Sequence, residues 1–234
     1  MLRQVAGRWG KIHYLGKDEY VGRSIHNYGE YNPDETEMII SLATPGKICL
    51  DIGANFGVMG QALEFNGFEV ISFEPQPELY KLVLSKNVSG LKYNCALGDT
   101  PGFAPMPKLR YDERNNFGSM GLGFRSALGS IQVEVRTLDS FNLDNIGLIK
   151  IDVEGFEEKV LRGGHETILR NKPIMYIEDD RAHLSKSLRE YITSLGYTIE
   201  EHKPALYREK NYFGYKKNIW DKNYVSHNLI CRPC

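Results

Sequence analysis

The chain has 234 residues, 41% hydrophobic and 25% charged, so it is long enough to bury a full core and has ordinary globular composition. Its formal net charge of -1 provides no overall positive field for nucleic acid. No run approaches the roughly 20 apolar residues of a membrane-spanning helix, and the first twenty residues lack the apolar centre of a signal peptide.

We predict one domain over residues 1–234, beginning with short strands or a loose cap at residues 1–31. A helix is predicted to begin at Asn32-Pro33-Asp34-Glu35. Asn is a favoured N-cap, Pro suits the first helical position, and Glu35 stands where a capping box has its acid. Pro45-Gly46 is expected to end this helix.

Short apolar runs then alternate with amphipathic segments. The predicted strands are Ile48–Ile52, Val70–Phe73, Leu91–Leu97, Ile146–Ile151 and Ile174–Ile177, and the first helices between them are Val58–Phe65 and about Glu78–Lys86. This alternation predicts a doubly wound α/β sheet with parallel strands and right-handed crossovers. Tyr197–Ile199 and Leu229–Cys231 have no room for a long crossover helix between them, so we expect an antiparallel pair at the sheet's edge.

Two segments interrupt the pattern. Residues 99–130 contain three prolines and several glycines and are too long for an ordinary connection. They form either an active-site lid or a surface insertion, and we favour the lid. Lys210–Lys222 is basic with interleaved aromatic residues, which suits single-stranded RNA, although an ordinary strand and loop explains it better.

The cysteines and histidines indicate no metal or redox centre. Cys49 and Cys95 lie in apolar runs and are predicted to be buried thiols. Cys231-Arg-Pro-Cys234 is a single C-x-x-C without a second pair. No His/Asp/Glu set has metal-ligand spacing, and His183 is only a secondary candidate base. We therefore expect a reduced, cytoplasmic protein without a metal site.

The strongest local motif is Asp51-Ile-Gly-Ala-Asn-Phe-Gly57, a glycine turn between a buried strand and a helix. Its glycines allow the backbone to approach a ligand, and the helix start offers free N–H groups. The turn lacks both the G-x-G-x-x-G fingerprint and the P-loop lysine. Glu74 ends the next strand, where an acid can accept both ribose hydroxyls. Together these features predict a nucleoside-type cofactor.

Three later acids are candidate catalytic residues. Asp152 and Glu154 follow the fourth predicted strand, and Glu178 closes the fifth. Acids are also favoured at helix starts, but an acid still close to a buried strand needs a partner, so Asp152 is the first candidate. A carboxylate in this position can accept the proton of an acceptor hydroxyl.

These residues together resemble the FkbM-type methyltransferases that depend on S-adenosylmethionine (SAM). The matching segments are Asp51–Gly57, Phe73-Glu74-Pro75, Asn94–Leu97, Thr137-Leu138-Asp139, Ile149–Glu157, Leu161–Gly164, Lys172-Pro173 and Glu178. The resemblance implies a class I fold, whose seven-stranded, mostly parallel sheet carries an antiparallel C-terminal edge strand. It also implies the cofactor contacts. The turn residues Asp51, Gly53, Ala54, Asn55 and Gly57 would hold the amino-acid end of SAM, Glu74 the ribose, and Cys95 and Ala96 the adenine, and we add Asp152 to this set.

The resemblance further implies methyl transfer to a hydroxyl of a small molecule or carbohydrate, and we expect no nucleic-acid partner. Three alternatives remain open: an N-methyltransferase acting on an amino sugar or small amine, an RNA methyltransferase, and a non-catalytic SAM-binding module. The intact Asp152/Glu154 pair argues against the last. The acceptor's identity and the oligomeric state do not follow from the sequence.

Overall fold

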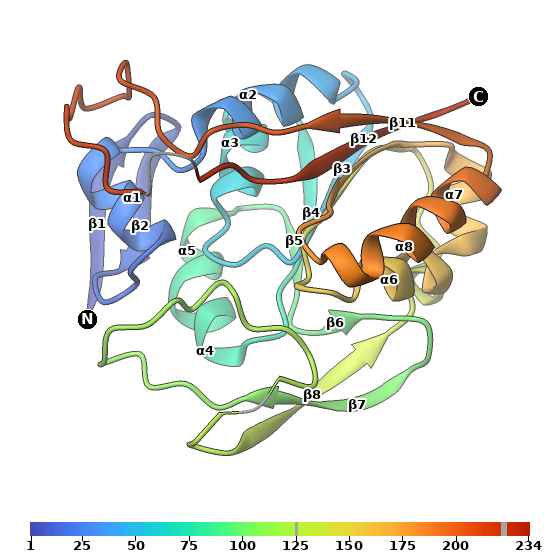
Figure 1. The fold of residues 1–234 in the computed structure, drawn as a ribbon, viewed down its shortest axis with the longest axis horizontal. Helices are drawn as coiled ribbons and strands as arrows, with labels where there is room; N and C mark the ends of the chain where they lie inside the picture. The colour runs from blue at the N-terminus through green and yellow to red at the C-terminus, as the bar shows by residue number, and fades with distance from the viewer. Residues whose placement is uncertain (125, 221–223) are drawn as a thin grey trace.

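The computed structural model describes residues 1–124, 126–220 and 224–234, and its main feature is a seven-stranded sheet (Figure 1). The strand order is β11-β12-β10-β9-β3-β4-β5. The strands are β3 (Ile48–Ile52), β4 (Glu69–Phe73), β5 (Leu91–Tyr93), β9 (Ile146–Ile151), β10 (Ile174–Glu178), β11 (Tyr197–His202) and β12 (Asn228–Pro233). Neighbours from β5 to β10 pair in parallel, which confirms the predicted, mostly parallel sheet.

The C-terminal pair is antiparallel, as predicted, but its order differs in one detail. Strand β12 lies between β10 and β11, so β11 and not the C-terminal strand forms the edge. The burial of the two strands explains this order. Residues 228–231 of β12 are all buried, whereas β11 alternates and exposes several side chains. A strand that is buried on both faces belongs inside the sheet, and a half-exposed strand can serve as its edge.

Helices cover both faces of the sheet. Helices α2 (Pro33–Leu42) and α3 (Val58–Phe65) pack on one face, where the sheet presents Cys49, Leu148 and Tyr176. The other face presents Leu50, Ile149 and Ile177 to α6 (Glu157–Gly163), α7 (His165–Asn171) and α8 (Ala182–Ser194), which group on the right of Figure 1. Successive strand residues therefore point to opposite helical layers, as a doubly wound sheet requires.

Helix α2 begins where it was predicted to begin, but the predicted capping box is wrong. Asn32 has a left-handed backbone (φ 40°) and makes no capping hydrogen bond to the helix. A capping side chain normally projects from an extended residue, and the left-handed conformation directs it elsewhere. The Asn32 amide instead donates to the carboxylate of Glu35, which is buried at 7% exposure.

The predicted strand Leu91–Leu97 is divided. Only β5 joins the main sheet, while β6 (Ala96–Leu97) pairs with β8 (Ser130–Arg136) in a separate sheet that also contains β7 (Gly102–Pro107). Asn94 causes the break, because its side chain donates to the carbonyls of Glu74 and Pro75. The predicted helix Glu78–Lys86 is continuous but contains a π-helical turn at Tyr80–Leu84, between α4 (Pro77–Leu79) and α5 (Ser85–Asn87).

The remaining segments lie beside the carboxyl ends of the parallel strands. Residues 1–31 form the hairpin β1 (Leu2–Gly7)–β2 (Gly10–Leu15) and helix α1 (Val21–Tyr28). The main-chain N–H of Phe117, from the 99–130 insertion, donates to Asp18 at 3.0 Å, so the insertion is tied to the N-terminal segment. Within the described residues, no helix combines the length and apolarity needed to cross a membrane.

Candidate functional site

Two adjoining cavities open at the carboxyl ends of the parallel strands. The first, here the Glu74 cavity, is lined by residues that include Phe73, Glu74, Cys95, Ala96, Met106 and Leu122. The second, here the Glu178 cavity, is lined by residues that include Tyr20, Tyr31, Glu35, Ala54, Lys150, Glu178 and Asp180. Both are also lined by Gly53, Asn55, Gly118, Asp152 and Glu154. Asp152 therefore lies at the junction of the two cavities.

The glycine turn after β3 is fixed by its neighbours on both sides. The N–H groups of Gly53 and Ala54 both donate to the carbonyl of Phe73, at 3.0 and 2.9 Å. Gly53 has φ 79°, and a β-carbon there would overlap the carbonyl oxygen of Asp152. Gly57 has the same φ, but it lines neither cavity, and a β-carbon there would meet Leu84 and Val88. Gly53 thus shapes the site, and Gly57 serves helix packing.

Glu74 lies where the nucleoside-binding acid was predicted. It is 3% exposed and lines the Glu74 cavity. Its carboxylate accepts two main-chain hydrogen bonds of 2.8 Å, from Asn55 and from Gln76. Burial raises the pKa of Glu74 to about 7, against the lowering effect of these two hydrogen bonds. The predicted adenine neighbours Cys95 and Ala96 line the same cavity.

The Glu74 cavity fits a nucleoside ligand. Phe73, Met106 and Leu122 provide apolar walls, and Glu74 provides the acceptor at its edge. Asn55 contributes a buried side-chain oxygen that has no hydrogen-bond partner among the described residues. An unpaired buried oxygen beside a cavity is costly unless a ligand donates to it.

Lys150 is a site residue that the sequence analysis missed. It is 4% exposed, and its ammonium lies 3.0 Å from the carbonyl of Gly53, 3.4 Å from an oxygen of Asp51 and 3.5 Å from an oxygen of Asp152. Burial alone would lower the pKa of Lys150, but the surrounding carboxylates, Asp152 first, outweigh burial and raise it. The available signal was a single charged residue in the apolar strand Ile146–Ile151.

Asp51, predicted to contact the cofactor, is fully buried and lines neither cavity. One carboxylate oxygen accepts the N–H of Gly60 in helix α3 at 3.2 Å, and the other faces Lys150. The structure therefore places this side chain beneath the glycine turn. Its negative charge is matched by Lys150.

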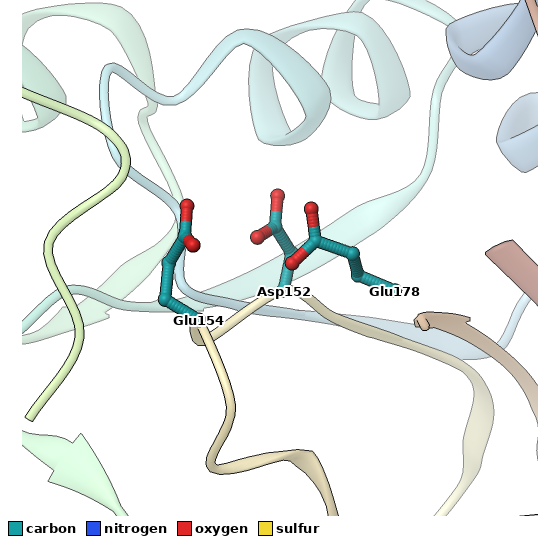
Figure 2. Close-up of side chains that lie close together, drawn as sticks. All are labelled: Asp152, Glu154 and Glu178. Atoms are coloured by element: carbon teal, nitrogen blue, oxygen red, sulfur yellow. The ribbon is translucent and has the colours of Figure 1, made fainter. Parts of the chain in front are cut away.

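Asp152, Glu154 and Glu178 come together as predicted. Figure 2 shows Asp152 between the other two, and one oxygen from each residue lies within 4.8 Å of the others. Glu154 pairs with Arg181. Burial, reinforced by the charge of Asp152, raises the pKa of Glu154 to about 7 and that of Glu178 well above its ordinary value.

Three acidic oxygens at this spacing could hold a divalent cation, but they suit shared protons equally well. Lys150 and Arg181 already supply positive charge to Asp152 and Glu154. We therefore assign no metal to the cluster.

Glu35 is a second missed residue, because its sequence position suggested only a helix cap. It projects from α2 into the Glu178 cavity. Burial and the charge of Asp152 raise the pKa of Glu35 to about 8. His183, the secondary candidate base, is exposed in α8 and lines neither cavity. Its position does not support a role in proton transfer.

The 99–130 insertion contributes a roof to both cavities. Gly118 lines both, Met120 and Leu122 line the Glu74 cavity, and Ser119 lines the Glu178 cavity. The roof is anchored at Phe117, which is fully buried. The side-chain amide of Gln76 donates to the Phe117 carbonyl at 2.9 Å, opposite the Asp18 contact described above. The segment lies over the site, as a lid would, and its opening and closing stay a prediction.

We predict that Gly53→Ala destabilises the fold more than Gly196→Ala does. Both glycines have φ 79°, so both substitutions impose the same backbone strain. Only Gly53 faces a second main-chain segment, since nothing lies within 4 Å of a β-carbon at Gly196. Chemical denaturation of both variants measures the difference, expected to exceed about 1 kcal/mol. Equal losses would show that the close approach to Asp152 costs nothing.

We also predict that the ligand-free protein loses stability as the pH rises from about 4.5 to 8. Glu35, Glu74 and Glu154 have pKa values of about 8, 7 and 7, raised chiefly by burial above the ordinary 4.5. A carboxyl with a raised folded-state pKa binds its proton more tightly in the folded state than in the unfolded state. Its contribution to the free energy of unfolding is therefore complete below pH 4.5, and it is lost as the pH rises through the folded-state pKa.

Urea denaturation across this pH interval measures the effect. The variants Glu35→Gln and Glu154→Gln should flatten the decline, whereas Glu166→Gln, on the exposed surface of α7, should not. Wild-type stability that instead increases between pH 5 and 8 would contradict the raised pKa values.

Comparison with known proteins identifies the family. The model of the family described as "Methyltransferase FkbM domain" matches residues 51–199 of the chain. No curated protein matches the chain. The methyltransferase FkbM of Methylobacillus flagellatus KT is similar in structure, with a TM-score of 0.51 and 17% identity over 91% of this chain and 55% of that one. This chain thus spans little more than half the length of that protein. The precorrin-6y C5,15-methyltransferase of Geobacter metallireducens GS-15 has a TM-score of 0.51 and 11% identity, over 85% of this chain and 88% of that one.

At these identities the two structures support the fold alone, a class I methyltransferase fold. The family match covers well over half of the chain. The chain therefore belongs to the FkbM methyltransferase family.

Proposed function

We propose that this methyltransferase transfers the methyl group to a hydroxyl of a sugar, nucleotide sugar or glycosylated small molecule. One observation carries the proposal: Asp152 lies at the junction of the Glu74 cavity, which has apolar walls and a buried acid, and a second, carboxylate-rich cavity. A carboxylate at that junction can receive the proton of a hydroxyl as the hydroxyl attacks. The free thiols of Cys49, Cys95 and Cys231 suit the reducing cytoplasm, where we propose that it acts.

When bound, SAM supplies the electrophilic methyl group. Glu74 would accept the ribose hydroxyls, and the turn at Gly53 and Asn55 would hold the amino-acid end. Asp152 would accept the proton of the acceptor hydroxyl. Glu154 and Glu178, whose pKa values are raised by burial and by the charge of Asp152, would bond other hydroxyls of the acceptor. Orientation of the two reactants lowers the activation barrier more than proton transfer does, by roughly 7–11 kcal/mol in favourable cases.

An N-methyltransferase acting on an amino sugar or small amine is the second candidate. The observation that favours it is the acidic lining of the Glu178 cavity, where Glu35, Asp152, Glu154, Glu178 and Asp180 outnumber Lys150 and Arg181. Carboxylates bind ammonium groups well. The same carboxylates would hold the substrate amine, and Asp152 would receive its proton.

RNA is the less favoured acceptor. The acid-lined Glu178 cavity would repel a phosphate backbone. Part of the basic-aromatic segment Lys210–Lys222 packs on the N-terminal segment: Tyr215 packs on Tyr28, and Trp220 packs on Tyr20. Tyr212 and Phe213 remain exposed, and Asp221 and Lys222 lie outside the described residues.

We predict that Glu74→Gln weakens binding of S-adenosylhomocysteine, the demethylated product of SAM, by about 10-fold or more. The variant keeps the shape of the side chain but removes a charged acceptor from the ribose hydroxyls. Titration calorimetry measures the affinity. Glu78→Gln is the matched control, because Glu78 is exposed on neighbouring α4. Unchanged affinity in folded Glu74→Gln would remove Glu74 from the cofactor site.

We predict that Asp152→Asn lowers turnover by about 100-fold or more while changing the affinity for S-adenosylhomocysteine much less. Turnover is measured as transfer of labelled methyl to sugars, amino sugars and total RNA, the last at two salt concentrations. Wild-type turnover in the Asp152→Asn variant would show that Asp152 is not the proton acceptor. Transfer to amino groups alone would establish the second candidate, and salt-sensitive transfer to RNA alone would refute both small-molecule assignments.

A further inference from the structure

Lys150 occupies a position where a lysine is costly. It lies in β9, between β3 and β10, and its strand neighbours Leu148, Ile149 and Ile151 are all buried apolar residues. A buried ion pair rarely contributes more stability than well-packed apolar side chains of similar volume. Fold stability alone therefore does not account for this ammonium.

The sheet register explains which groups Lys150 reaches. Lys150 pairs directly with Asp51 of β3, and Asp152 lies two residues further along, on the same face of the sheet. The carbonyl of Gly53 completes the set: it accepts a hydrogen bond of 3.0 Å from the ammonium, and the oxygens of Asp51 and Asp152 lie 3.4 and 3.5 Å from the same nitrogen. These oxygens come from the buried end of β3, the glycine turn and the junction of the two cavities.

We propose that Lys150 is a positioning residue that fixes the glycine turn and Asp152 relative to each other. Through the Gly53 carbonyl it holds the turn that faces the Glu74 cavity, and through Asp152 it holds the proton acceptor that faces the Glu178 cavity. The relative placement of cofactor and acceptor then depends on one ammonium. The effect on turnover rests on the proposed function, whereas the effect on cofactor binding does not.

Removal of the ammonium should therefore weaken cofactor binding in the Glu74 cavity and slow methyl transfer at the Glu178 cavity together. In Lys150→Ala we expect affinity for S-adenosylhomocysteine to fall by about 10-fold or more and turnover by about 100-fold or more. Lys47→Ala, which removes an exposed lysine near the start of β3, is the matched control. Calorimetry measures the affinity, and methyl transfer to the best acceptor of the wild-type protein measures turnover.

Chemical rescue separates positioning from general loss of structure. The Glu178 cavity reaches Lys150, so ethylammonium can enter the space that Lys150→Ala leaves. Ethylammonium chloride should restore part of both the affinity and the turnover, while potassium chloride at equal ionic strength should not. The methylated product is identified by mass, so that methylation of the amine itself is recognised.

The double variant Asp51→Asn/Lys150→Met tests the proposal if Lys150→Ala fails to fold. It removes both buried charges together and fills the space, so it should fold, lack both functions and resist rescue. Wild-type affinity and turnover in either folded variant would overturn the proposal. Rescue of folded Lys150→Ala by ethylammonium no greater than by potassium chloride would also overturn it. If the wild-type protein methylates no hydroxyl or amine, the proposed function fails, and the affinity and its rescue alone decide the role of Lys150.

Discussion

The contact of the Lys150 ammonium with Asp51, Asp152 and Gly53 is the constraint on which the rest of the site depends. Asp51 is fully buried, and an isolated buried carboxylate is costly enough to be neutralised or to disrupt the fold. With Lys150 beside it, Asp51 can bond the start of α3, and the turn between β3 and α3 can stay compact. The same charge allows Asp152 to stand beside Glu154 and Glu178.

Glu74 differs from Glu154 and Glu178 in the groups that surround its carboxylate. Glu74 has two main-chain donors and lies outside the Asp152, Glu154 and Glu178 cluster, so its surroundings suit the binding of neutral hydroxyls. Glu154 and Glu178 share one region with Asp152, and like charges at that distance favour protonation of some members. In the proposed function, the same residue types thus provide both a binding acid and a proton-handling group, because main-chain donors surround Glu74 and carboxylates surround Asp152.

Much of the fold was predictable from the sequence. The predicted strands Ile48–Ile52 and Ile146–Ile151 match β3 and β9 residue for residue, because a strand buried on both faces has a nearly continuous apolar sequence, interrupted here only by Asp51 and Lys150. The unpredicted features depend on contacts between distant segments. Asn94 divides a predicted strand through hydrogen bonds to residues 74 and 75, and Lys150 acquires its role only once the register pairs it with Asp51. Glu35 was interpreted from its local spacing, which says nothing about the cavity it faces.

The two cavities differ in where their walls originate, and this has an evolutionary consequence. Much of the Glu74 cavity is built from the ends of β3 and β4 and from the residues that follow β5. The Glu178 cavity instead takes Tyr20 and Tyr31 from the N-terminal segment, and Leu206 and Tyr224 from the connection between β11 and β12. These segments lie outside the main sheet, and their described residues are absent from the two hydrophobic clusters on its faces, so their cavity-facing side chains can diverge with little cost to the packing of the sheet. Under the proposed function, a lineage with this fold can thus acquire new acceptors while it retains an ancestral cofactor.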